Sequence, residues 1–261
     1  MFDSGFGGLT VARAVIDLMP GEDLVYLGDT ARYPYGPRSL EEVRRFAHQI
    51  ADFLVERVDP KLLIVACNTA AAAALAELQE RLDIPVVGVI EPGVRAVVSA
   101  TTTGRVGVIG TVGTIGSGAY QRAVAAADPD ITLACAACPG FVEFVERGEA
   151  NSDQVRVLAE RLLAPIGDAE VDTLLLGCTH YPYLARTISD AVGRDVVLVS
   201  SADETGFEVR SLLEEAGCQA PPRSAAGTHR FLSTGDVEWF RELGQRLLGP
   251  EVLDVEPHSW E

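Results

Sequence analysis

The sequence predicts an α/β fold in which mainly parallel sheets are flanked by helices and two pseudo-symmetric halves face one another. Three observations support this prediction. Short apolar runs are continuous and rich in Val, Ile and Leu, as are strands buried on both faces of a parallel sheet. Amphipathic segments alternate with these runs, as helices alternate with strands in β–α units. The stretch LLIVACNTAAAAAL at 62–75 is also similar to TLLLGCTHYPYL at 173–184, which indicates two related halves.

Each expected element has a local signal. In chain order, strands are expected over 24–27, 62–66, 86–90, 106–110, 131–134, 173–177 and 196–200, with a short one near 230–232. Helices are expected from about residue 9, after a glycine-rich turn, and over 40–58, 69–82, 153–163, 204–216 and about 237–248. Within 40–58, for example, Val43, Ala47 and Leu54 recur at helical spacing with charged residues between them.

Composition and charge exclude several classes of function. The 261 residues suffice for a substantial core in one or two domains. With 21 basic and 38 acidic residues the net charge is −17, so phosphate backbones repel the chain and no nucleic-acid partner is expected. No uncharged run is long enough to cross a bilayer, and the first residues lack a basic export signal, so no membrane association is expected. The five cysteines, an odd number, then indicate reduced thiols in a cytoplasmic protein.

Lysine is nearly absent from the chain. Lys61 is the single lysine among the 21 basic residues. Pyridoxal phosphate enzymes hold their cofactor as a Schiff base on a lysine. Because Lys61 begins an apolar run instead of ending a strand or helix, no pyridoxal cofactor is expected.

Two cysteines occupy equivalent positions in the two similar stretches. Cys67 and Cys178 each follow a predicted strand, at the sheet edge where ligands of α/β folds bind. Each also precedes a helix or turn, and a helix N-terminus favours a thiolate. An inert buried cysteine is the alternative at each position. Two thiols on opposite sides of a carbon can invert it, because one removes the Cα proton while the other supplies a new one.

Polar residues near these cysteines are candidate helpers. Asn68 and Thr69 follow the first cysteine, and Thr179 and His180 follow the second, where they can cap a helix or donate hydrogen bonds to a carboxylate. Asp3 lies in the glycine-rich segment DSGFGG, which is typical of an anion-binding helix start, although an ordinary capped loop is the alternative.

Three further segments remain ambiguous from sequence. Glu146 is a possible proton-transfer helper, but glutamates recur every three residues over 143–149, as on a solvated helical face. The turns YPYGPR at 33–38 and GTVGT at 110–114 either hold a ligand or only redirect the chain. Cys135 and Cys138 form a lone CxxC motif, interpreted as structural because no second ligand pair accompanies it. A zinc site formed by Asp3, Cys67, Cys178 and His180 is a minor alternative.

The residues and the order of six motifs resemble those of a known family over nearly the whole chain. DSGFGGLTV, YLGDTARYPYG, ACNTA, GVIEPG, VGVIGT and LLLGCTHYP follow one another between Phe2 and about Phe240. In this order they resemble the glutamate racemases of the cofactor-independent aspartate/glutamate racemase superfamily. The resemblance implies two α/β domains with the active site between them, and interconversion of L- and D-glutamate without pyridoxal or metal. It also implies a homodimer that supplies D-glutamate for peptidoglycan synthesis.

The resemblance also assigns roles to individual residues. It implies that Cys67 is the acid/base acting on the D-enantiomer and Cys178 the one acting on the L-enantiomer. Asp3 matches the residue that assists the first thiol, whereas His180 and Glu146 match helpers of the second. The implied substrate contacts are Asp3, Ser4, Tyr35, Gly36, Asn68, Thr69, Thr111, Thr114, Thr179 and His180.

Domain boundaries and alternatives complete the expectations. Residues 1–91 with 205–261 are expected to form the first domain, and 92–204 the second.

Family members carry an apolar strand before the DSG motif, of which only Met1 and Phe2 are present here. A missing central strand would expose sheet edges and leave Asp3 beside a mobile terminus.

The alternative functions are racemisation of aspartate or another amino acid, binding of an acidic amino acid without catalysis, and zinc-dependent hydrolysis.

Overall fold

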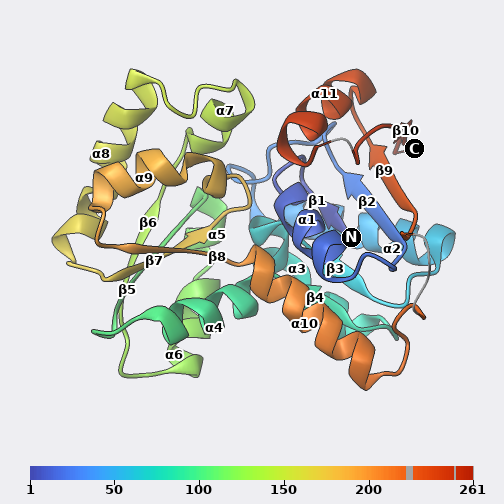
Figure 1. The fold of residues 1–261 in the computed structure, drawn as a ribbon, viewed down its shortest axis with the longest axis horizontal. Helices are drawn as coiled ribbons and strands as arrows, with labels where there is room; N and C mark the ends of the chain where they lie inside the picture. Colours follow the sequence, from blue (N-terminus) through green and yellow to red (C-terminus); the bar gives the residue numbers. More distant parts are fainter. Residues whose placement is uncertain (222–225, 250, 261) are drawn as a thin grey trace.

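The strands form two parallel sheets, one in each of two lobes (Figure 1). The computed structural model describes residues 1–221, 226–249 and 251–260. The first sheet has the order β10-β9-β2-β1-β3-β4 and contains β1 (Phe2–Asp3), β2 (Leu24–Gly28), β3 (Leu63–Val65), β4 (Val86–Gly88), β9 (His229–Ser233) and β10 (Val255–Pro257). The second has the order β6-β5-β7-β8 and contains β5 (Arg105–Gly110), β6 (Thr132–Ala137), β7 (Thr173–Gly177) and β8 (Val197–Ser200). The predicted α/β class with parallel sheets is confirmed, and the exact domain boundaries stay a prediction.

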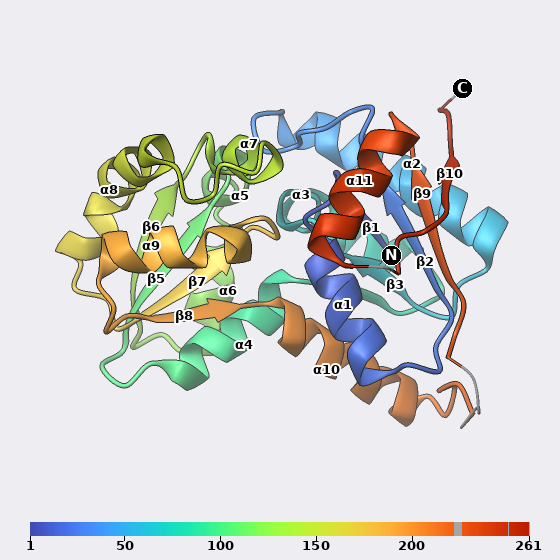
Figure 2. The ribbon, with the colours of Figure 1, turned by 45° about the horizontal axis from the view of Figure 1, so that its top comes forward.

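Helices cover both sheets and meet at the junction of the lobes. The first sheet is flanked by α1 (Leu9–Leu18), α2 (Leu40–Val58), α3 (Asn68–Arg81), α10 (Ala202–Glu215) and α11 (Val237–Leu247). The second lobe holds α4 (Ile90–Ala100), α5 (Val112–Gly116), α6 (Ala119–Ala127), α7 (Phe141–Glu146), α8 (Asp153–Asp168), the 3₁₀ helix η1 (Tyr181–Leu184) and α9 (Ala185–Val192). Helices α4 and α10 contact each other between the lobes, as Figure 2 shows. Among the described residues, no helix combines the length and apolarity needed to cross a bilayer.

Local chemistry explains which elements the sequence predicted. Helix α2 has the predicted bounds because Ser39 caps it by accepting a hydrogen bond from the Glu42 amide. The expected strand over 86–90 is too long, since β4 ends at Gly88 and α4 begins at Ile90. The start of α4 was not predicted because Pro92 and Gly93 both have low helix propensity. Proline is nevertheless tolerated in the first turn of a helix.

The amino-terminal strand is short but present, which corrects the expectation of a missing strand. Phe2 pairs with Leu27 on one side and Val65 on the other, so β1 separates β2 from β3. The Met1 ammonium donates a hydrogen bond of 2.7 Å to the Val25 carbonyl. Asp3 is fully buried and pairs with Gly28 in this strand, so it is held in the sheet.

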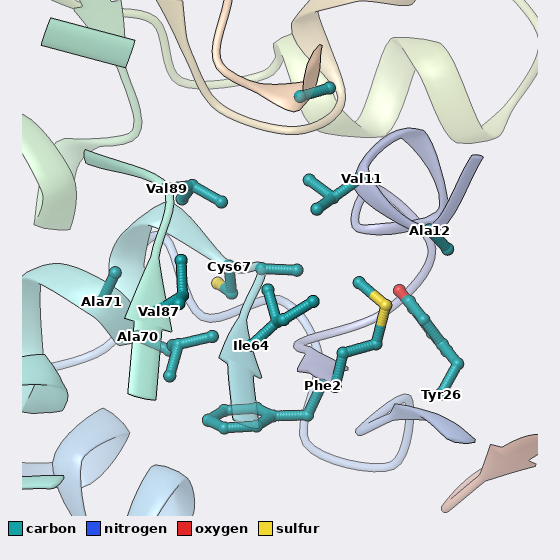
Figure 3. Close-up of a cluster of buried hydrophobic side chains, with 14 of the residues drawn as sticks. Phe2, Val11, Ala12, Tyr26, Ile64, Cys67, Ala70, Ala71, Val87 and Val89 are labelled. Carbon is teal, nitrogen blue, oxygen red and sulfur yellow. The ribbon is translucent and has the colours of Figure 1, made fainter. Parts of the chain in front are cut away.

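One hydrophobic core spans the junction of the lobes. It includes the interior of the first sheet and continues to Val106, Val108 and Leu175 on one face of the second. A separate cluster fills the other face of the second sheet, beneath α7, α8 and α9. Figure 3 shows the Cys67 side chain among apolar neighbours that include Ile64 and Val87. Burial of such side chains stabilises the fold by about 25 cal/mol per Å² of apolar surface. This core therefore fixes the end of β3 relative to the second lobe.

Candidate active site

Cys67 lies in an anionic, buried environment at the end of β3. It is the N-cap residue of α3 and is 5% exposed. Its Sγ lies 3.7 Å from the Ser4 hydroxyl, which accepts its hydrogen bond. Burial, together with the negative charge of Asp3, raises the pKa of Cys67 to about 12. The thiol is therefore protonated at neutral pH.

Cys178 lies beside a cationic histidine at the end of β7. Its Sγ is 4.0 Å from His180 Nδ1, and His180 Nε2 is 3.3 Å from Glu146 Oε1. Burial disfavours the imidazolium, but hydrogen bonds to Cys178 and Glu146 outweigh it and raise the pKa of His180 to about 10. The Glu146 side chain is only 10% exposed, so the interpretation of this residue as part of a solvated face is wrong.

A hydrogen bond connects the two lobes at the floor of the site. Thr179 Oγ1 donates to Asp3 Oδ2 over 3.4 Å, and the Gly5 amide donates to Asp3 Oδ1 over 2.9 Å. Burial raises the pKa of Asp3, and the nearby His180 charge opposes that rise. Gly7 makes the approach possible, because a Cβ there would come within 2.2 Å of Thr179 Oγ1 and 2.4 Å of His180 Nδ1.

Both cysteines border one small cavity. Its lining is drawn from both lobes and consists of Ser4, Tyr33, Pro34, Tyr35, Gly36, Cys67, Asn68, Thr69, Thr111, Val142, Cys178, Thr179 and His180. The enclosed volume is about 20 Å³, which is room for about one water molecule. The Gly113 amide donates to the Gly36 carbonyl over 2.9 Å and joins the lobes above this space. At this volume the cavity is too small for an amino acid.

Most residues predicted to contact substrate lie at this cavity. Thr114 is set back from it, but its hydroxyl lies 3.1 Å from that of Thr69 and 2.9 Å from that of Thr111. The Thr69 and Thr111 hydroxyls are also 3.0 Å apart, so three hydroxyls form a closed triangle between α3 and α5. Thr111 additionally caps α5, which means that the helix-cap and binding interpretations of GTVGT are compatible.

The turn at 33–38 contributes more than the sequence suggested. Tyr33 lines the cavity, and its ring centroid is 6.2 Å from that of His180. Tyr35 is fully buried, and its hydroxyl donates a hydrogen bond to Asp29, so only the rest of the residue is available to the cavity. Tyr33, Pro34 and Val142 were not predicted as site residues. Tyr33 and Pro34 could have been identified from their place in the same rigid turn as Tyr35.

Asp29 connects this turn to the end of the chain. Its carboxylate is fully buried and accepts hydrogen bonds from Arg32 Nε over 2.7 Å, and from Thr234 Oγ1 and Trp260 Nε1 over 2.8 Å each. The Arg32 guanidinium also lies 4.1 Å from the Phe46 ring centroid and 4.4 Å from that of Trp260. The carboxyl-terminal segment thereby holds the turn that lines the cavity.

The remaining cysteines and the metal hypothesis gain no support from the geometry. Cys135 and Cys138 are free thiols, and burial raises their pKa values to about 11 and about 12 respectively. They stay interpreted as structural. Within the described part of the chain, no group of three or more His, Cys, Asp or Glu side chains is arranged to hold a metal ion.

Comparison with known proteins places the chain in a family. A family model described as Asp/Glu/Hydantoin racemase matches residues 9–205. A glutamate racemase from Acidothermus cellulolyticus is 53% identical over 255 residues, covering 98% of this chain and 96% of that protein.

Solved structures agree in fold over the full chain. A glutamate racemase isoform from Bacillus anthracis superposes with a TM-score of 0.92 at 43% identity, covering 100% of this chain and 96% of the other. The glutamate racemase of Francisella tularensis, in complex with D-glutamate, gives a TM-score of 0.92 at 35% identity, covering 99% and 95%. With its two parallel sheets and paired cysteine-bearing strand ends, the chain belongs to the Asp/Glu/Hydantoin racemase family.

Proposed function

We propose that the protein is a glutamate racemase that interconverts L- and D-glutamate by moving the Cα proton between Cys67 and Cys178. The observation that carries this proposal is one cavity bordered by two buried thiols, each at the end of an inner strand of its own sheet. Thiols that approach from different lobes can face opposite sides of one carbon, as inversion requires. The 53% identity to a glutamate racemase supports glutamate as the substrate.

The proposed reaction uses one thiolate and one thiol, which exchange roles with each turnover. For D-glutamate, the Cys67 thiolate removes the Cα proton and the Cys178 thiol delivers a proton to the opposite face. For L-glutamate the order is reversed. The substrate ammonium supplies a positive charge that favours the Cys67 thiolate and offsets the effect of Asp3 on its pKa. No external electron sink takes part in this scheme.

The proposed helpers differ between the two sides. Asp3, whose pKa is raised by burial, accepts the Cys67 proton before the D-enantiomer reacts. On the other side, the His180 imidazolium is held by Glu146, and it stabilises the Cys178 thiolate and returns protons to it. Asn68, Thr69, Thr111 and Thr179 offer amide or hydroxyl groups to the substrate carboxylates.

The cellular role extends this proposal. We also propose that the protein acts as a cytoplasmic homodimer and supplies D-glutamate to peptidoglycan synthesis, as the resemblance of its motifs implies. The closed cavity indicates that opening precedes substrate binding, since about 20 Å³ cannot hold an amino acid.

Exchange of the Cα proton tests the proposal directly. The protein is incubated in deuterated water with D-glutamate or D-aspartate, and no cofactor is added. Optical rotation and Cα deuterium are followed together. We expect glutamate alone to lose rotation while it gains deuterium. Exchange of aspartate alone would identify an aspartate racemase, and glutamate binding without any exchange would identify a binding protein.

A further inference from the structure

The amide of the Asn68 side chain has a paired oxygen and an unpaired nitrogen. Asn68 begins α3 directly after Cys67 and is 3% exposed. Its Oδ1 accepts a hydrogen bond of 2.6 Å from the Tyr120 hydroxyl, whereas its buried Nδ2 has no partner. A buried polar group without a partner is unfavourable for the fold. Because Asn68 lines the cavity, the unpaired Nδ2 is a donor available to a ligand.

Tyr120 reaches Asn68 from the other lobe. It lies on α6, is fully buried and does not border the cavity. Its ring packs against Gly177, the residue before Cys178, where a Cβ would come within 2.8 Å of Tyr120 Cε2. The absence of a side chain at Gly177 therefore leaves the space that the ring occupies. Tyr120 thus contacts the strand end that carries one thiol and the residue beside the other.

The hydroxyl of Tyr120 determines which end of the amide is free. Burial raises the pKa of Tyr120 well above its ordinary value, so the hydroxyl keeps its proton. If the Asn68 amide were turned over, this proton would lose its acceptor and the Asn68 carbonyl would be free instead. A free carbonyl would suit the ammonium of an amino acid, whereas the free Nδ2 suits a carboxylate.

We propose that Tyr120 is a positioning residue that fixes the Asn68 amide with Nδ2 free to bind a carboxylate of the amino-acid substrate. The role rests on the proposed function and adds a residue to it that does not itself touch the substrate. Tyr120 acts only through Asn68. Because its ring and its hydroxyl contact different lobes, the correct amide orientation forms only when the lobes are together.

A double-mutant cycle tests this role. Y120F removes the hydroxyl and keeps the ring, and we expect KM for both enantiomers of glutamate to rise about tenfold, while kcat falls less than about threefold. N68A raises KM further. Y120F/N68A is expected to be no worse than N68A alone, because the hydroxyl has no effect once the amide is gone. Y183F is the matched control, since it removes a tyrosine hydroxyl that donates to the Leu247 carbonyl over 3.4 Å, outside the cavity.

The outcomes separate this inference from the proposed function. The same cycle is measured with glutamate dissociation constants by calorimetry, so the positioning role is judged even if the protein binds glutamate without racemising it. Additive penalties in the double variant, or an unchanged KM and dissociation constant in a folded Y120F, would overturn the inference. If Y120F does not fold, N68D replaces it as the test. N68D is expected to bind glutamate more weakly than N68A, because an oxygen then faces the carboxylate, and tighter binding than N68A would refute the role.

Discussion

Cys67 and Cys178 follow inner strands of two parallel sheets, yet the chain folds differently after each. Cys67 caps a 14-residue α-helix, so its side chain lies at a full helix N-terminus. Cys178 is followed by a turn and a four-residue 3₁₀ helix that begins at Tyr181. The helix dipole that could favour a thiolate is therefore available to the first cysteine more than to the second.

The charged groups beside the two thiols differ in sign: Cys67 has a carboxylate nearby, whereas Cys178 has an imidazolium. Cys67 has the Asp3 carboxylate nearby, which with burial raises its pKa to about 12. Cys178 has His180, whose own pKa is raised to about 10 by its partners despite burial. A pseudo-symmetric backbone thus carries an unsymmetrical set of charges. Similar strand ends therefore place the two thiols, whereas non-equivalent neighbours from other elements set the charge beside each.

Removing either thiol has the largest expected effect. C67S and C178S are each expected to slow racemisation about 10³-fold, because a serine hydroxyl is a far weaker acid and base than a thiol. Glutamate binding, measured by calorimetry, is expected to change little. C135S is the matched control, since this thiol lies outside the cavity. Near-normal turnover in either active-site variant would show that the two halves are not equivalent partners in proton transfer.

Changing the charged partner of each thiol is expected to slow the reaction of one enantiomer more than that of the other. D3N is expected to slow deuterium exchange at Cα mainly from D-glutamate, and H180N mainly from L-glutamate, each by about 10²-fold. The reason is that each group serves a different thiol. Exchange is followed by mass spectrometry at early times from each pure enantiomer. Equal slowing of both enantiomers in both variants would contradict the division of roles.

The pH dependence of stability tests the Cys178 side of the cavity when the unmodified protein is compared with H180N. The pKa of His180 is raised from its ordinary value of 6.5 to about 10, so the protonated form stabilises the fold fully below about pH 6.5. This contribution is lost as the pH rises toward 10. Between these limits the free energy of unfolding is expected to fall more steeply with pH in the unmodified protein than in H180N. Urea titrations with reductant present give this difference, and parallel pH profiles would refute it.

The smallest effect is expected from the contact between the carboxyl-terminal segment and the turn. W260F keeps an aromatic ring beside Arg32 but removes the hydrogen bond to Asp29. We expect KM to rise about threefold and stability to fall by about 1 kcal/mol. W239F, at a tryptophan that is 38% exposed, is the control. If W260F matches that control in KM, the segment does not position the turn on the Cys67 side of the cavity.

Local signals in the sequence predicted much of the fold. Continuous apolar runs predicted the buried parallel strands, and cap residues such as Ser39 predicted where helices begin. Helix α6 was missed because it is only nine residues long and begins after Gly118 without a side-chain cap. The strand β1 was expected to be missing because only Met1 and Phe2 stand where family members carry a longer apolar strand. Its neighbours β2 and β3 give these few residues a place in the sheet.

The sequence by itself determined the α/β class and the two cysteines at equivalent strand ends, because both depend on patterns of adjacent residues. Tertiary structure decided what surrounds those thiols. The contact between Asp3 and Thr179 joins residues 176 positions apart, and Tyr120 meets Asn68 across 52 positions. Glu146 could be a surface residue or a partner of His180 until α7 was placed beside η1. Hydrogen bonding and burial depend on distance in space, so no local pattern could distinguish these alternatives.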